Sequence, residues 1–125
     1  MNTPKNLMYT ESHEWVEING DSMKMGLTAH AAEELGDLVF INLPEVDDEV
    51  VAEENLGDVE SVKAVSDIIS PATGKVAAVN EAALDDPGSV NADPYGVWLC
   101  EIANVSAKRN LLTPEEYEKL LAEEA

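Results

Sequence analysis

Lys63 lies at the centre of a segment that is nearly a palindrome, Glu60-Ser61-Val62-Lys63-Ala64-Val65-Ser66-Asp67. A hairpin that turns at Lys63 and Ala64 would pair Val62 with Val65, and it would leave the ε-amine of Lys63 exposed at its tip. An exposed amine is open to covalent modification. However, the segment lacks the Gly, Asn or Pro that is typical of tight hairpin turns. Taken alone, a lysine in this position is more often a solvated surface cation than a modification site.

A second lysine has neighbours that imitate a modification site. Met23-Lys24-Met25 matches the M-K-M sequence of biotin-accepting domains. Those domains place the lysine at a hairpin tip, whereas Lys24 lies inside the alternating segment 23–27, which is typical of a strand. We therefore expect Lys24 to be an exposed strand lysine with methionine neighbours that face inward.

Other chemistry is poorly supported by the sequence. It contains no G-x-G-x-x-G or Walker pattern that would bind phosphate. Its two histidines and one cysteine are scattered and do not form a metal-binding pattern. We expect His13 to be structural, Cys100 to belong to the core, no bound metal and no catalytic residue, so the protein is not expected to be an enzyme.

The charge excludes several classes of partner. The chain has 26 acidic and 7 basic residues, a formal net charge of -19, and no Lys or Arg between Met25 and Val62. Nucleic acids and anionic membranes bind basic surfaces, so neither is expected as a partner. The acidic stretch is either a solvated surface or a face that attracts basic partners. The single cysteine, the lack of a secretory signal and the lack of a long apolar run favour the cytoplasm.

Short strands separated by turns predict a mainly β fold of one domain, residues 1–125. The expected strands are 13–18, 23–27, 38–43, 75–79 and 97–102, together with one long, broken strand region at 56–69. The continuous apolar run 38–43 predicts a buried strand. Alternation over 13–18 places Trp15 on one face and Glu14 on the other, so we expect an exposed Glu14 whose removal leaves folding intact.

Two helices are expected among the strands. Thr28 can cap a short helix near residues 29–35 that Gly36 ends. Thr113-Pro114-Glu115-Glu116 is a strong start signal, with Thr113 as the cap, Pro114 in the first turn and Glu116 completing a capping box. The second helix should cover about 114–123 and dock through an apolar stripe.

A set of motifs changes the interpretation of Lys63. The sequence E-S-V-K-A-x-S-D at 60–67, followed by S-P-x-x-G at 70–74, resembles the modification site of the glycine cleavage H protein family. Four further matches occur in order: S-H-E-W-V at 12–16, E-E-L-G-D at 33–37, L-P-E-V at 43–46 and N-x-D-P-Y-G at 91–96. Chance would rarely supply such a series, and it covers residues 9–102.

The resemblance implies a barrel-sandwich hybrid fold related to lipoyl and biotinyl domains, with lipoate joined by an amide to Lys63. It implies a non-enzymatic carrier that moves an aminomethyl group and reducing equivalents. The implied partners are glycine decarboxylase, aminomethyltransferase, dihydrolipoamide dehydrogenase and lipoylating enzymes. A monomer is expected, because a carrier must visit several partners.

The same resemblance implies roles for two further residues. Glu14, in the H-E-W motif, would lie near the amine of the carried aminomethyl group, and His30 would be a residue of the cleft that holds the arm. Two alternatives stay open for the chain as a whole. It could act mainly as a lipoyl donor to 2-oxo acid dehydrogenases, or it could be an acidic interaction domain without a cofactor.

Overall fold

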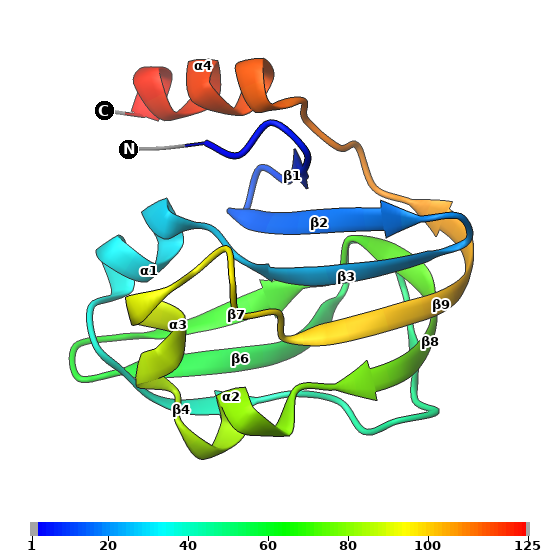
Figure 1. Ribbon diagram of the computed structural model, residues 1–125, viewed down its shortest axis with the longest axis horizontal. Coiled ribbons are helices and arrows are strands. Elements are labelled where there is room, and N and C mark those ends of the chain that lie inside the picture. The colour runs from blue at the N-terminus through cyan, green and yellow to red at the C-terminus, as the bar shows by residue number, and fades with distance from the viewer. Residues whose placement is uncertain (1–2, 125) are drawn as a thin grey trace.

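The computed structural model describes residues 3–124 and is mainly β, as the sequence predicts (Figure 1). The strands are β1 (Met8–Tyr9), β2 (Glu14–Asn19), β3 (Ser22–Leu27), β4 (Leu38–Asn42), β5 (Glu49–Val50), β6 (Asn55–Ser61), β7 (Val65–Ile69), β8 (Ala72–Val79) and β9 (Cys100–Lys108). The helices are α1 (Ala29–Leu35), α2 (Glu81–Asp85), α3 (Gly88–Ala92) and α4 (Pro114–Glu124). None of the helices in this part of the chain is long and apolar enough to span a membrane.

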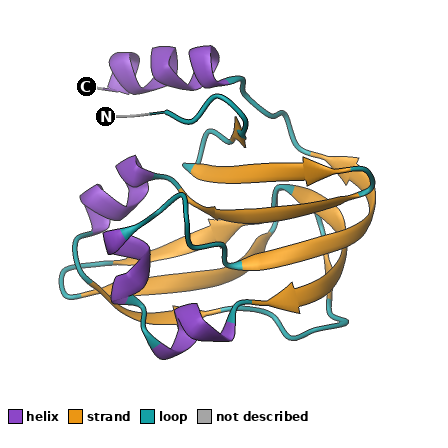
Figure 2. Ribbon diagram, viewed as in Figure 1, coloured by secondary structure: helices purple, strands orange, loops and turns teal. Residues whose placement is uncertain are grey.

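Two antiparallel sheets enclose the core. One has the strand order β1-β2-β3-β9-β8-β5, and the other has the order β4-β6-β7. Inward-facing residues of both sheets form a continuous buried cluster, including Val16 and Met25 from the larger sheet and Val59 and Ile68 from the smaller one. Figure 2 shows α1, α2 and α3 gathered at one end of the sheets. The fold therefore concentrates its short helices, and the loops that join them, at one end.

A smaller aromatic cluster attaches α4 to the rest of the protein. Tyr117 of α4 stacks on Tyr9 of β1 at 4.7 Å between ring centroids, and Leu7 and Trp15 complete the buried cluster. Burial raises the pKa of both Tyr9 and Tyr117 above the usual tyrosine value. Since α4 lies over the N-terminal strands in this way (Figure 1), the first three residues of β2, Glu14, Trp15 and Val16, are buried on both faces of the strand.

The capping predictions are confirmed. Thr28 Oγ1 accepts a hydrogen bond from Ala31 N at the start of α1. At α4, Glu116 N donates to Thr113 Oγ1 and Thr113 N donates to Glu116 Oε1, which is the reciprocal arrangement of a capping box. Helix caps can be predicted well from sequence because they depend only on residues that are neighbours in the chain.

Three structural predictions are wrong in detail. The run 38–43 forms β4 but is not buried throughout: Val39 and Phe40 are 55% and 51% exposed, because β4 is an edge strand with a register shift between Leu38 and Phe40. Strand β9 begins at Cys100 and not at residue 97, because the carbonyls of the preceding residues Trp98 and Leu99 accept hydrogen bonds from Asn80. Helices α2 and α3, five residues each, were not expected, since helices so short carry little periodic signal.

Candidate functional site

The hairpin between β6 and β7 presents Lys63 to solvent, but its register differs from the expected one. Glu60 pairs with Val65 and Val59 with Ser66, so Val62 and Lys63 are the turn residues instead of Lys63 and Ala64. Val59 and Ile68 are buried and would share the core face in either register, so the hydrophobic pattern does not choose between the two. The shift also leaves Val62 and Val65 unpaired with each other, and they are 74% and 64% exposed.

Ser61 replaces the Gly or Asn that such a turn usually needs. Its hydroxyl oxygen accepts hydrogen bonds from Lys63 N at 3.3 Å and Ala64 N at 3.0 Å. The backbone closes the turn with a bond from Ser61 N to Ala64 O at 2.8 Å. We call residues Ser61–Ala64 the tip. The Ser61 side chain thus accepts hydrogen bonds from backbone N–H groups that would otherwise have no partner in the turn.

The Lys63 side chain is exposed and makes no ion pair within the described residues 3–124. Its stem lies over Gly36, at the end of α1: a Cβ atom on Gly36 would be 3.3 Å from Lys63 Cε. Gly36 has φ 79° and ψ -163°, a conformation that is essentially restricted to glycine. The tip and the end of α1 are therefore in contact at Gly36, and Val62 N also donates a hydrogen bond to the Asp37 carbonyl at 3.3 Å.

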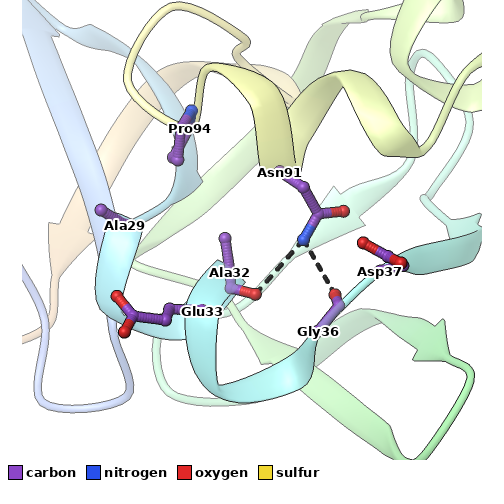
Figure 3. A pocket seen from close by; sticks show the side chains of 7 residues that line it. All are labelled: Ala29, Ala32, Glu33, Gly36, Asp37, Asn91 and Pro94. Atoms are coloured by element: carbon purple, nitrogen blue, oxygen red, sulfur yellow. Dashed lines mark hydrogen bonds between the residues drawn. The ribbon is translucent and has the colours of Figure 1, made fainter.

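An open groove of about 420 Å³ begins at Gly36 and runs between α1 and the segment after α3 (Figure 3). Its other lining residues are Ala29, Ala32, Glu33, Asp37, Asn91 and Pro94. Figure 3 shows the Asn91 side chain joining the walls, where Nδ2 donates to the carbonyls of Gly36 at 2.8 Å and Ala32 at 3.2 Å. In addition, Asn91 Oδ1 accepts a hydrogen bond from Leu38 N. Asn91 fixes the shape of the groove beside Lys63.

Glu14 is not exposed, contrary to the alternation argument. Only 1% of it is accessible, because it lies on the face of β2 that it shares with the core residue Val16 and that points toward the second sheet, whereas α4 packs on the opposite face against Trp15. Its Oε1 accepts hydrogen bonds from the hydroxyls of Thr10 at 2.5 Å and Ser12 at 2.6 Å, and Arg109 Nη1 lies 3.5 Å away. Its Oε2 accepts one long bond, 3.4 Å from Ile69 N at the end of β7. We call these residues the Glu14 pocket.

His30 does not line the groove beside Lys63. Its imidazole points to another group of residues, His13, Glu34 and Glu124, and the rings of His13 and His30 are 4.5 Å apart. The cleft position of His30 therefore stays a prediction, which the lining of this groove does not support. The two histidines that seem scattered in the sequence come together because β2 and α1 start side by side.

Two other residues singled out by sequence lie in strands. Lys24 is a residue of β3 between the buried Met23 and Met25, as expected, but it is half-buried and not exposed, and its ammonium lies 5.2 Å from the centroid of the Trp98 ring. Cys100 is fully buried, and burial raises the pKa of its thiol to about 12. Neither residue is placed to react with a partner.

Two residues of the site were missed by sequence reasoning. Arg109 is the single arginine of a strongly acidic chain, and that rarity was the available signal for a paired cation. Asn91 begins the N-x-D-P-Y-G motif, but the motif does not indicate that its side chain binds the Gly36 carbonyl. Both act between segments that are far apart in the sequence, which local patterns do not show.

Comparison with known proteins agrees with this geometry. A family described as "Glycine cleavage H-protein" matches residues 7–124. The chain is 51% identical to a glycine cleavage system H protein from Rubrobacter xylanophilus, over 97% of this chain and 96% of that one. It is 48% identical to one from Geobacillus sp., over 98% and 99%. The crystal structure of the H protein from Mycobacterium marinum superimposes with a TM-score of 0.90 at 45% identity, covering 95% of this chain and 98% of that one.

Proposed function

Since the chain belongs to the glycine cleavage H-protein family, we propose that Lys63 carries its lipoyl group, joined by an amide to Nζ. The family makes the chain a lipoyl carrier of the glycine cleavage system with a barrel-sandwich fold. The names of the relatives favour this role over that of a lipoyl donor to 2-oxo acid dehydrogenases. We further propose that residues 1–125 act as one domain, that they catalyse no reaction themselves, and that the protein is a cytoplasmic monomer.

The exposure of Lys63 is the observation that supports the attachment site most directly. The amine has no competing ion pair among the described residues, and Val62 and Val65 on either side offer apolar contact to a lipoylating enzyme. Lipoate, once attached, supplies a dithiolane that can accept two electrons and an aminomethyl group. Lys63 contributes an extended attachment point, and its modification removes a positive charge from a surface rich in acids.

The groove beside Lys63 would hold the attached arm between its visits to partners. Ala29, Ala32 and Gly36 give it a floor of small residues, and Asn91 keeps its walls together. Small side chains leave room for an apolar chain, whose burial is favourable by about 25 cal/mol per Å² of apolar surface. The groove therefore fits the proposed cofactor.

We also propose that Glu14 accepts a hydrogen bond from the amine of the carried aminomethyl group. Its Oε1 already has three partners, so Oε2, with one long bond, is the oxygen with free capacity. Glu14→Gln keeps the size of the side chain and removes its charge, and it should shorten the lifetime of the carried group in the isolated protein. An unchanged lifetime, measured at one pH by release of formaldehyde, would remove this role.

The partners that we propose are glycine decarboxylase, aminomethyltransferase, dihydrolipoamide dehydrogenase and the lipoylating enzymes. Exposed acids lie on several segments between α1 and β6, including Glu33, Glu45, Asp48 and Glu53. A partner with a basic rim around its active site would be attracted to this surface, and the attraction would weaken with salt.

Mass spectrometry of the whole chain tests the proposal. Protein that has been treated with a lipoyl ligase, ATP and lipoate should gain the mass of one lipoyl group, which should map to the peptide that contains Lys63. Lys63→Arg should abolish the gain, and Lys24→Arg should leave it unchanged. A gain of mass that persists in Lys63→Arg would overturn the attachment site.

A further inference from the structure

His13, His30 and Glu124 come from three separate parts of the chain and meet on one side of the molecule. His13 immediately precedes β2, His30 is in the first turn of α1, and Glu124 ends α4, which Figure 1 shows running back over α1. One potential ligand atom from each of the three residues lies within 4.8 Å of the others. Glu34, one helical turn after His30, adds a second carboxylate.

We propose that these four residues, the histidine cluster, bind one zinc ion. Imidazole nitrogens and carboxylate oxygens are ligands that Zn²⁺ accepts readily, and four of them complete the coordination of a closed structural site. Neither the carrier function nor the groove beside Lys63 uses this cluster. The site would be structural, in addition to the lipoyl attachment site.

The separations among His13, His30 and Glu124 are close to those of a zinc site, whereas Glu34 lies near His30 and would have to turn toward the other two residues to become the fourth ligand. His13 Nε2 is 3.1 Å from Glu124 Oε1, and His30 Nε2 is 3.3 Å from Glu34 Oε1 and 3.9 Å from Glu124 Oε1. Tetrahedral zinc with bonds of about 2.0–2.1 Å holds its ligand atoms about 3.3–3.4 Å apart. The observed separations bracket that value.

Groups behind the cluster can orient His13 as a ligand. Its Nδ1 lies 2.8 Å from the Tyr117 hydroxyl, which in turn lies 2.8 Å from Thr28 Oγ1. When Nδ1 carries the proton and donates it to Tyr117, the lone pair of Nε2 is directed at Glu124. Metal-bound histidines almost always use their second nitrogen in this way. His13 also has φ 72°, so its backbone is held in an uncommon conformation that fixes the start of its side chain.

The charges around the cluster favour a divalent cation. Among the described residues, the ion-pair partners of Glu34 and Glu124 are histidines, not Lys or Arg. The histidine side chains are mostly buried, 18% and 20% exposed, whereas the side chains of Glu124 and Glu34 are 41% and 71% exposed. A bound Zn²⁺ would balance these two carboxylates and would link α4 to α1 and to the start of β2. The end of α4, which is otherwise exposed, would then be fixed.

Zinc titration of the metal-free full-length protein tests the proposal by calorimetry. We expect one Zn²⁺ per chain and a higher melting temperature in the presence of zinc, because the ion binds the folded state. The titration is done on the lipoylated protein and on Lys63→Arg, since a reduced lipoyl arm would itself bind zinc. Equal stoichiometry in both proteins is expected, and a site that disappears in Lys63→Arg would overturn the proposal.

Variants then locate the site. His30→Gln and Glu124→Gln should each weaken zinc binding at least tenfold, and His13→Asn should do the same while keeping a residue that tolerates positive φ. Glu123→Gln is the matched control: it removes the same charge from the same helical turn but lies in a groove with Glu116 and Lys119. Circular dichroism checks the fold of each variant. No zinc binding, or equal weakening in Glu123→Gln and Glu124→Gln, would overturn the proposal.

Discussion

The tip and the Glu14 pocket lie near the two ends of strand β7, yet they are built in opposite ways. Lys63, just before β7, is exposed and unpaired among the described residues, and a single serine side chain organises its turn. Glu14 meets the other end of β7 at Ile69 N, is fully enclosed, and is surrounded by two hydroxyls and one guanidinium.

The two regions therefore serve different purposes: the tip offers an attachment point, and the Glu14 pocket supports the fold. An amine that an enzyme must reach has to remain free of contacts, so its loss should affect modification and leave stability alone. A buried carboxylate must have its charge compensated, so its loss should affect stability before anything else. We therefore expect substitutions in the Glu14 pocket to lower the free energy of unfolding more than substitutions at the tip.

The largest effect is expected for Glu14→Ala. It leaves the guanidinium of Arg109, 9% exposed, without its carboxylate partner, and it leaves the buried Thr10 hydroxyl without its acceptor. Removal of one partner from a buried pair costs about 3–5 kcal/mol, so urea denaturation should show a loss of about 3 kcal/mol.

Glu17→Ala is the control for that measurement. Glu17 is on the same strand, is half-buried, and pairs across the sheet with Lys24. Its loss should cost less than about 1 kcal/mol, as for other cross-strand charge pairs. Equal losses in the two variants would mean that the Glu14 pocket has no special place in the fold.

Sequence patterns predicted the parts of this site that depend on neighbouring residues. The caps at Thr28 and Thr113 follow from residues within one helical turn, and the motif around Lys63 identified the tip. The sequence misplaces the turn itself by one residue, because both registers put Val59 and Ile68 on the core face and the hydrophobic pattern does not distinguish them. The observed turn is closed by the bonds of Ser61 to Lys63 and Ala64, which the near-palindrome does not reveal.

Burial of Glu14 was not predictable from strand alternation. The two faces of a strand can be assigned from its sequence, but whether the second face meets solvent depends on what packs there. In this chain α4 packs on the Trp15 face, and the Glu14 face points toward the end of β7, where Arg109 arrives from the segment after β9. The return of α4 also brings Glu124 to the two histidines, which no local pattern connects.

Gly36→Ala should have the next largest effect, because Gly36 adopts a backbone conformation that alanine disfavours. Its φ of 79° with ψ of -163° is unfavourable for alanine by about 1–3 kcal/mol. The new Cβ would meet only the flexible Lys63 stem at 3.3 Å, so the backbone term should dominate the loss measured by urea denaturation. If Lys63→Ala restores the stability of Gly36→Ala, the contact with the stem is the cause and this explanation is wrong.

Ser61→Ala tests the organisation of the tip and should cost less. Water can replace the hydroxyl at an exposed turn, so we expect a loss of about 0.5–1 kcal/mol. The amides of Lys63 and Ala64, which both donate to Ser61 Oγ, should exchange faster with solvent in this variant. Ser66→Ala is the matched control in the same hairpin, because its hydroxyl makes only a long bond to Asp67 O. Unchanged exchange at Lys63 and Ala64 would show that the backbone holds the turn without Ser61.

The smallest effect on stability is expected for Lys63→Ala, below about 0.5 kcal/mol, as for surface substitutions without specific contacts. Lys24→Ala provides the comparison between two lysines of the same chain. Lys24 is half-buried and lies 5.2 Å from the Trp98 ring, so its removal should cost about 0.5–1 kcal/mol through the lost cation–π contact. The lysine that matters less for folding should be the one that matters for the carrier: after treatment with a lipoyl ligase, Lys24→Ala should gain the lipoyl mass and Lys63→Ala should not. A loss above about 1 kcal/mol in Lys63→Ala would place Lys63 among the residues that support the fold, and the contrast between the tip and the Glu14 pocket would fail.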